Sequence, residues 1–189
     1  MTGPFVITTW FLMLAAYNFG HIQITSLPHP VVAVQPPVSD LFTLDMRQFW
    51  HAAFAGVSQV FLINNVITGI LFLIGLAVSS VWAAVFAFVG SLVAICTAVI
   101  LGGGSTAIIA GLFQFSAVLT AIGLGTTFYK PNWRVVIYAL VGTIFTVVAQ
   151  GALNVVLNTF GIPTLTFPFV IAAWIFLLPN LDLLPASHR

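Results

Sequence analysis

Long apolar runs separated by short polar breaks dominate the pattern of this chain. A helix that crosses a bilayer needs about 20 mainly apolar residues, within a range of roughly 17–25. Runs of about this length cover residues 3–19, 66–80, 81–101, 106–128, 133–158 and 164–184. The four runs between residues 66 and 158 are separated by the breaks SS, GGGS and KPNW. The pattern therefore predicts an all-α protein with about six transmembrane helices.

One further segment is too short to cross a membrane by itself. Residues 51–65, HAAFAGVSQVFLINN, are moderately apolar and end in two asparagines. Such a segment is typical of a re-entrant helix, because irregular backbone at membrane depth must be surrounded by protein or line a water-filled cavity. The Pro-rich stretch before it, residues 20–50, contains SLPHPVVAVQPPVSD and is predicted to be a connection outside the membrane.

The last apolar run begins with two prolines. The sequence GIPTLTFPF places Pro163 and Pro168 five residues apart. Proline removes a backbone donor and leaves a carbonyl without its helical partner. A broken helix is expected at this point.

The two ends of the chain carry related sequences. TGPFVITTWFLML begins at Thr2 and TFPFVIAAWIFLL begins at Thr166, with identical residues at 7 of 13 positions. This match indicates an internal repeat. Five spans and one re-entrant segment make a unit with an odd number of crossings, so a second copy in the same chain would be inverted in the membrane.

Composition agrees with the membrane interpretation. The chain is 61% hydrophobic and 4% charged, with a mean hydropathy of +1.18. Seven formally charged side chains cannot cover the surface of a soluble domain of 189 residues. The net charge of +1 comes without a basic patch, which excludes nucleic acid as a partner.

The residue types that carry most enzyme chemistry are scarce in the apolar runs. The histidines and aspartates lie in or beside the polar connections or in the last residues of the chain, at His21, His29, His51, His188, Asp40, Asp45 and Asp182, and the sequence has no glutamate. We therefore predict no catalytic residue, metal site or cofactor. Cys96 is the single cysteine, inside SLVAICTAVI, and is predicted to be a small packing residue.

The few cations indicate an orientation. With residues 51–65 returning to their own side, Lys130, Arg134 and Arg189 fall on one face of the membrane and Arg47 on the other. The positive-inside rule then places the C-terminus in the cytoplasm, on a majority of three cations against one.

Three motifs, in order along the chain, carry a family resemblance. They are AGVSQVFLINNVITGILFLIGLAVSS, AIIAGLFQFSAVLTAIGLGTTFY at residues 107–129, and GIPTLTFPFVIAAWIFLL. Together they resemble the urea transporters. The resemblance implies a fold of two halves inverted about a central pore, with three chains forming a trimer.

The resemblance also implies a division of the chain. Residues 1–19 look like the last transmembrane helix of a truncated first repeat, and residues 20–50 look like an extracytoplasmic linker. Residues 51–189 are similar to a complete second repeat, with the re-entrant helix and five transmembrane helices. On this interpretation the first repeat is mostly missing.

The chemistry of a urea pore can be stated independently of the family. Urea is small, planar and neutral, with four N–H donors and one carbonyl acceptor. A narrow slot of stacked acceptor oxygens can replace its water, while aromatic faces hold its plane. Apolar walls exclude ions through the cost of dehydration.

Matching the family motifs residue by residue gives the predicted pathway. The resemblance implies that Gln59 and Val60 lie at the end of the re-entrant helix, and that Thr166 lies midway with Thr2 as its mate. Phe61 and Leu62, which follow Val60, are included in the pathway, and Phe115 and Leu119 would form slot walls.

Two positions depart from the family pattern. An aromatic residue usually follows this glutamine by three positions, whereas here position 62 is Leu62 and the aromatic Phe61 stands one earlier. Ser116 occupies the place of a family asparagine that could brace discontinuous backbone.

The leading hypothesis is a passive channel for urea, and for small amide analogues, in a cell membrane such as the bacterial inner membrane. Two alternatives stay open. One is a channel for another small neutral solute such as ammonia, and the other is a truncated membrane remnant or accessory subunit that transports nothing.

Overall fold

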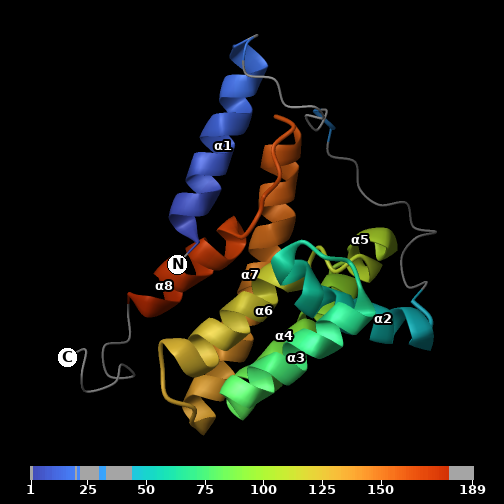
Figure 1. Cartoon of the computed structure of the whole chain (residues 1–189), viewed down its shortest axis with the longest axis vertical. Helices are drawn as coiled ribbons and strands as arrows, with labels where there is room; N and C mark the ends of the chain where they lie inside the picture. The colour runs from blue at the N-terminus through green and yellow to red at the C-terminus, as the bar shows by residue number, and fades with distance from the viewer. Residues whose placement is uncertain (1, 20, 22–29, 33–43, 179–189) are drawn as a thin grey trace.

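The computed structural model describes residues 2–19, 21, 30–32 and 44–178, and its regular secondary structure is entirely helical (Figure 1). The elements are α1 (Gly3–Asn18), α2 (Met46–Ser58), the 3-10 helix η2 (Gln59–Phe61), α3 (Val66–Ser79), α4 (Val81–Ile100), α5 (Ser105–Ile109), α6 (Gln114–Ile122), the π-helical turn η3 (Gly123–Thr127), α7 (Trp133–Asn158) and α8 (Phe167–Leu177). The predicted all-α class is confirmed for these residues.

The predicted count of six spanning helices is not confirmed. Among the described residues, α4 and α7 are long and apolar enough to cross a membrane. The segment of α2 and η2 is followed by α3 at a bend of 71°. These two parts make a third crossing only if they are counted together as one span. α3 has 14 residues and α8 has 11, so each is too short to cross a membrane as a single helix.

The run at 106–128 is not one continuous helix, contrary to the prediction. α5 ends at Ile109, and Gly111 then turns the chain with φ of +79° before α6 begins at Gln114. The Gln114 side chain replaces helical hydrogen bonds lost at this break. Its Nε2 donates to the Ile108 carbonyl at 2.8 Å, and its Oε1 accepts from the Phe113 N–H at 3.1 Å.

The helix predicted to start at residue 51 starts five residues earlier, at Met46. Asp45 caps it by accepting from the Gln48 N–H at 2.7 Å, and the Gln48 side chain accepts from the Asp45 N–H at 3.0 Å. This reciprocal capping box stabilises the first turn. The predicted boundary between residues 20–50 and 51–189 therefore falls inside α2.

The chain before α8 is irregular rather than a broken helix. α7 ends at Asn158, and positive φ values at Gly161 and Leu165, 66° and 49°, interrupt any helical continuation. α8 then begins at Phe167 with Pro168 in its first turn, where a missing N–H is tolerated. Residues 179–184 of the predicted run lie outside the described residues.

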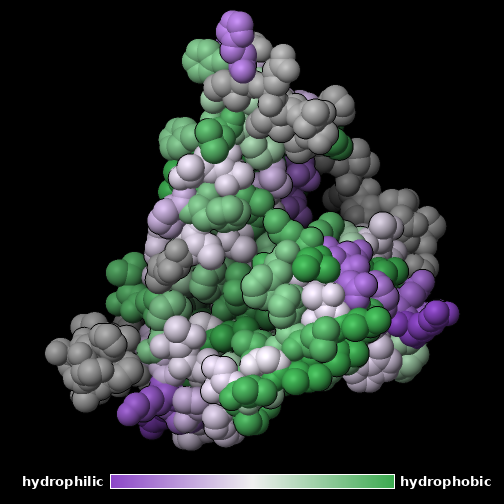
Figure 2. All heavy atoms as spheres, viewed as in Figure 1, coloured by the Kyte–Doolittle hydropathy of each residue, from purple (hydrophilic) through white to green (hydrophobic). Residues whose placement is uncertain are grey.

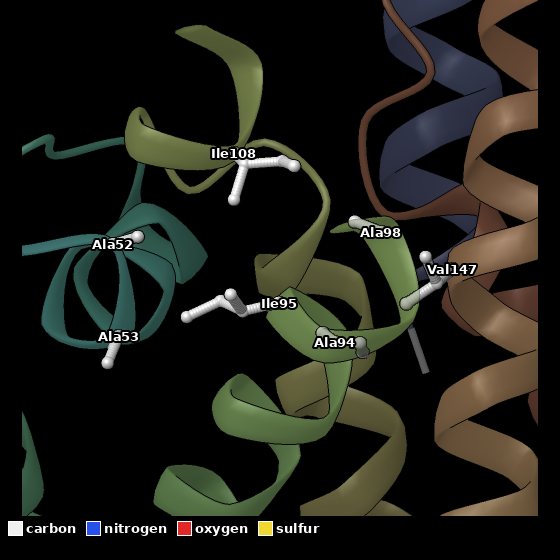
Figure 3. Close-up of a cluster of buried hydrophobic side chains, with 8 residues drawn as sticks. Ala52, Ala53, Ala94, Ile95, Ala98, Ile108 and Val147 are labelled. Atoms are coloured by element: carbon white, nitrogen blue, oxygen red, sulfur yellow. The ribbon is translucent and has the colours of Figure 1, made fainter. Parts of the chain in front are cut away.

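Small side chains let the helices around α4 approach closely. Figure 3 shows side chains of a core cluster from α2, α4, α5 and α7, namely Ala52, Ala53, Ala94, Ile95, Ala98, Ile108 and Val147. Ala117 of α6 belongs to the same cluster. Close packing also involves Gly69 of α3, where a Cβ would lie 2.2 Å from the Phe54 carbonyl oxygen. Cys96 is exposed on α4, so its predicted packing role is wrong.

α1 lies beside the start of α8 at one edge of the molecule (Figure 1). Val6 is fully buried there, and the Trp10 indole N–H donates to the Pro163 carbonyl at 2.8 Å. The repeated motif has the same local geometry in both copies. Thr2 and Thr166 precede their helices with φ of −84° and −89°, and each helix has proline in its first turn.

Hydrophobic side chains cover much of the face seen in Figure 2, and hydrophilic groups gather toward its extremities. Large apolar residues of several helices are exposed, including Ile74, Val78, Trp82, Ile100 and Val148. A soluble protein rarely exposes so much contiguous apolar surface. The surface is the kind that contacts lipid.

A buried tyrosine in the loop before α7 predicts an alkaline stability limit. The Tyr129 hydroxyl donates to the Phe176 carbonyl at 3.0 Å, and burial, followed by the nearby Tyr138, raises the pKa of Tyr129 above 10.0. Because the folded-state pKa is the higher one, this contribution is complete below pH 10.0 and is lost as pH rises through the raised value.

Thermal unfolding in detergent micelles between pH 8 and 11 should therefore show a loss of stability for the parent chain that Tyr129→Phe lacks. At pH 8 the variant should be less stable by up to about 1 kcal/mol, because the Phe176 carbonyl loses one of the two tyrosine hydroxyls, Tyr129 and Tyr138, that donate to it. If the thermal stability of the parent chain and of Tyr129→Phe fell equally between pH 8 and 11, this role of Tyr129 would be refuted.

Candidate solute-binding site

Two helix ends meet beside Gln59. The helix α2 passes into η2 at Gln59, and the Gln59 Nε2 donates to the Ala110 carbonyl at 2.8 Å. Ala110 caps the short helix α5, so its carbonyl belongs to the break before α6. The bond fixes one end of the glutamine side chain, and Leu62 then turns the chain with φ of 59°.

Close packing of backbone against backbone makes this meeting possible. A Cβ on Gly111 would lie 2.9 Å from the Ala55 carbonyl carbon and oxygen, and also 2.9 Å from the Gly56 nitrogen. A Cβ on Gly56 would lie 2.4 Å from the Gln114 Cβ. α2 can therefore rest against the break between α5 and α6 only because these positions lack side chains.

The two repeated threonines meet directly. The Thr166 hydroxyl donates to the Thr2 Oγ1 at 2.8 Å, joining positions 164 residues apart. Thr166 follows Leu165, whose carbonyl accepts from the buried Ser116 hydroxyl at 3.4 Å. Ser116, despite standing in place of the family asparagine, thus still contacts the irregular backbone.

A cavity of about 160 Å³ brings most of the predicted residues together. Its lining residues are Phe5, Gln59, Val60, Phe61, Leu62, Phe115, Leu165 and Thr166. Six of these belong to the pathway predicted from the sequence, and Thr2 joins them through its bond to Thr166. Phe5 and Leu165 were not predicted.

The predicted wall residue Leu119 has other neighbours. It packs against Phe169, Val170 and Ala173 and is not among the residues that line this cavity. Phe61 lines the cavity but is 59% exposed, and its ring centroid lies 4.2 Å from that of Phe72 of α3, at an angle of 32°. The aromatic group beside the end of α2 is thus a pair of rings from η2 and α3.

A second cavity of about 270 Å³ shares several walls with the first. Its lining comprises Gln59, Leu62, Leu112, Phe115, Gln150, Asn154, Asn158, Pro163, Thr164 and Leu165. The polar residues of α7 were missed by the sequence analysis. Their spacing was the available signal, because Gln150, Asn154 and Asn158 recur every four residues inside a hydrophobic run and so share one helix face.

Among the described residues, neither cavity has a charged side chain in its lining. The polar groups there are carboxamides and hydroxyls, which offer hydrogen bonds without attracting ions. His51, the histidine in α2, lies to one side with its Nδ1 3.3 Å from the Ile109 carbonyl. The arrangement suits a small neutral solute.

The helical fold, apolar surface and neutral cavities define an integral membrane protein. A family model for urea transporters matches residues 1–181. The chain belongs to the urea transporter family, whose members are transport channels rather than enzymes.

Mammalian relatives agree with this assignment. The chain is 30% identical to urea transporter 1 of Ovis aries over 193 residues. The matched region covers 98% of the chain and 49% of the relative. It is 34% identical to urea transporter 1 of Capra hircus and 33% identical to that of Mus musculus, each over 132 residues, or 69% of the chain and 34% of the relative. The chain therefore spans about half or less of the length of these relatives.

Proposed function

We propose that this chain provides a passive transmembrane pathway for urea and small amide analogues. The observation that carries the proposal is the charge-free cavity where Gln59, Phe115 and the Thr166–Thr2 hydroxyl pair come together. These groups supply hydrogen bonds and flat apolar walls, as a planar neutral solute requires.

Each polar side chain has an identifiable role. Because the Gln59 Nε2 donates to the Ala110 carbonyl, the Gln59 Oε1 stays available to accept a urea N–H. The Thr166 hydroxyl donates to Thr2 and keeps lone pairs for a second urea N–H. Acceptors from the re-entrant end and from the start of α8 thus replace part of the water that urea loses.

The apolar walls account for selectivity. Phe115 is 8% exposed and lines both cavities, where its ring can contact the urea plane. An ion entering this lining would lose its hydration without gaining a charged partner. The described lining residues of the two cavities include no ionisable side chain, which supports a passive pathway over one coupled to protons or ions.

We further infer that residues 1–19 correspond to the last helix of one repeat and residues 51–189 to the other, inverted repeat. The matched caps at Thr2 and Thr166 support this relation. A homotrimer in a cell membrane, such as the bacterial inner membrane, is the assembly proposed from the family resemblance.

Stopped-flow efflux from proteoliposomes holding this chain tests the function. Urea efflux should be faster than from protein-free liposomes and should be unchanged by an imposed proton gradient. The chain should accelerate urea efflux more than it accelerates ammonia efflux. Selective ammonia flux would favour the alternative small-solute channel. Absence of any flux would favour a remnant or accessory subunit.

Substituting Gln59 with leucine is expected to lower urea flux about tenfold, because one pathway acceptor is removed and the Ala110 carbonyl loses its donor. Gln59→Glu keeps the acceptor oxygens but loses the donor to Ala110. Urea flux through the three proteins in matched proteoliposomes measures this effect. Unchanged flux in Gln59→Leu would remove Gln59 from the pathway.

A further inference from the structure

The segment between α7 and α8, residues 159–166, is irregular, yet it ends on Thr166, whose hydroxyl pairs with Thr2. Its backbone has φ values of 66° at Gly161 and 49° at Leu165. A non-glycine residue with positive φ is strained, and it persists only when the surrounding structure holds it in place. The contacts that hold this segment therefore also decide where the Thr166 hydroxyl points.

Three consecutive residues near the end of this segment are each anchored to a different helix. The Pro163 carbonyl accepts from the Trp10 indole N–H of α1 at 2.8 Å. The Leu165 carbonyl accepts from the Ser116 hydroxyl of α6 at 3.4 Å. Thr164, the residue between them, is anchored to α7 through its side chain. Attachments to three helices fix the orientation of the segment as well as its position.

The attachment of Thr164 to α7 is a closed network of three side chains. The Gln150 Nε2 donates to the Asn154 Oδ1 at 2.9 Å and also to the Thr164 hydroxyl oxygen. The Thr164 hydroxyl in turn donates to the Asn154 Oδ1 at 3.1 Å. Gln150 is 2% exposed and Thr164 is 6% exposed, so water competes little for these bonds. The Gln150 Oε1 has no partner, which means that the Nε2 donor alone orients this amide.

Thr164 and Thr166 belong to the same turn. The Phe167 N–H donates to the Thr164 carbonyl at 3.2 Å, which closes a turn with Leu165 and Thr166 at its centre. The backbone angles inside a closed turn are coupled, so a shift of Thr164 changes the direction of the Thr166 Cα–Cβ bond. In the arrangement that the network holds, the Thr166 hydroxyl lies 2.8 Å from the Thr2 Oγ1.

We propose that Thr164 is a positioning residue for the candidate site. Held by Gln150 and Asn154, it sets the turn that places the Thr166 hydroxyl against Thr2. Its role requires no contact with the solute, because it acts through Thr166. The consequence for transport rests on the proposed function, whereas the geometry can be measured in a chain that conducts nothing.

Disulfide cross-linking measures the geometry of the two threonines without relying on flux. Thr2→Cys and Thr166→Cys are combined with Cys96→Ala, so that the chain holds only the two introduced thiols. In phosphatidylcholine nanodiscs, copper–phenanthroline oxidises these thiols to a disulfide, and mass spectrometry of the digested chain follows the bond. It should form rapidly with Thr164 in place, because a disulfide needs Cβ atoms held about 3.5–4.5 Å apart.

Adding Thr164→Val to this chain should lower the rate of disulfide formation about threefold to tenfold, because valine keeps the shape but loses the bonds to Gln150 and Asn154. Thr164→Ser retains the hydroxyl and should restore most of the rate. Thr143→Val is the matched control on α7, since the buried Thr143 hydroxyl donates to the Ala139 carbonyl of its own helix at 2.7 Å. It should leave the rate unchanged.

A second variant covers the case in which Thr164→Val does not fold in a thermal melt. Asn154→Ala removes the acceptor that Gln150 and Thr164 share, and it leaves the Thr164 side chain intact. It should slow disulfide formation in the same direction. Gly151→Ala is its neighbouring control, because a Cβ at Gly151 meets nothing within 4 Å.

Urea flux separates a positioning role from a general effect on stability. Thr164→Val should lower flux about threefold to tenfold in the parent chain. In a Thr166→Val chain it should cause little further loss, because both substitutions act through the same hydroxyl. A loss of equal size in both backgrounds would overturn the positioning role, since it would show that Thr164 acts independently of Thr166.

The outcomes distinguish the two proposals. Cross-linking that depends on Thr164 in a chain without urea flux would support the positioning role while contradicting the proposed function. Urea flux accompanied by equal cross-linking rates with Thr164 and with a folded Thr164→Val chain would overturn the positioning role while leaving the function intact. Absence of cross-linking with Thr164 in place would also overturn it, because Thr2 and Thr166 would not be neighbours.

Discussion

Replacing Thr166 with valine is expected to reduce urea flux through proteoliposomes at least about tenfold. Valine matches threonine in shape but has no hydroxyl. The substitution therefore removes an acceptor from the cavity and leaves the Thr2 hydroxyl without the donor that lies 2.8 Å away. Sites that recognise a solute by hydrogen bonds discriminate strongly when one bond is missing.

A hydroxyl outside the cavity provides the control. The Thr97 hydroxyl donates only to the Val93 carbonyl of its own helix at 2.7 Å, so Thr97→Val makes the same chemical change away from the site. It should leave urea flux unchanged. Comparable flux in Thr166→Val and Thr97→Val would show that the Thr166–Thr2 pair lies outside the permeation pathway.

Substituting Gly111 with alanine should destabilise the fold by about 3 kcal/mol or more. The residue has φ of +79°, and its Cβ would meet backbone atoms of Ala55 and Gly56 at 2.9 Å. Backbone cannot move aside by rotating a side chain. The substitution should therefore separate α2 from the break between α5 and α6, and displace Gln59 from the Ala110 carbonyl.

Thermal unfolding in detergent micelles measures the stability change, and urea flux measures the loss of the site. Gly151→Ala and Gly75→Ala are matched controls, because a Cβ at either position meets nothing within 4 Å. Both should unfold at or slightly above the parent temperature, since alanine favours helix. A Gly111→Ala protein as stable as these controls would contradict the proposed close packing.

Hydropathy predicted which segments are apolar helices better than it predicted whether each helix is continuous. The apolar run at 106–128 is predicted to be one span because most of its side chains suit a membrane interior. The break depends on Gly111 with positive φ and on the Gln114 side chain, which bonds to the Ile108 carbonyl. A hydrophobicity pattern records side-chain preference, and it does not record which backbone bonds a buried glutamine replaces.

The start of α2 shows a different limit. Asp45 and Gln48 form a capping box whose residue types were visible in the sequence, although the apolar pattern placed the start at residue 51. Helix boundaries follow caps as well as hydrophobicity. The misplaced boundary therefore came from following hydrophobicity alone.

Some residues of the candidate site were predicted from the sequence, and others could be placed only by the structure. The repeat related Thr2 to Thr166, and the resemblance to urea transporters assigned both of them, with Gln59 and Phe115, to the pathway. Leu119, predicted as a wall, packs toward Phe169, Val170 and Ala173. Which face of a short helix meets a cavity depends on the rotation of that helix against its neighbours, and an isolated motif leaves this rotation open.

The sequence by itself determined the membrane character, the helical class, the family and the pairing of the two repeated threonines. The first two follow from hydropathy and composition, and the last two from the repeat and from motifs that resemble the urea transporters, all of which are recorded locally along the chain. The tertiary structure alone decided that Gln59 bonds to Ala110, that Ser116 reaches Leu165, and that the carboxamides of α7 line a second cavity. These contacts join residues 49 and 51 positions apart, or depend on the rotation of whole helices. They form only when close packing at glycine brings separate helix ends together.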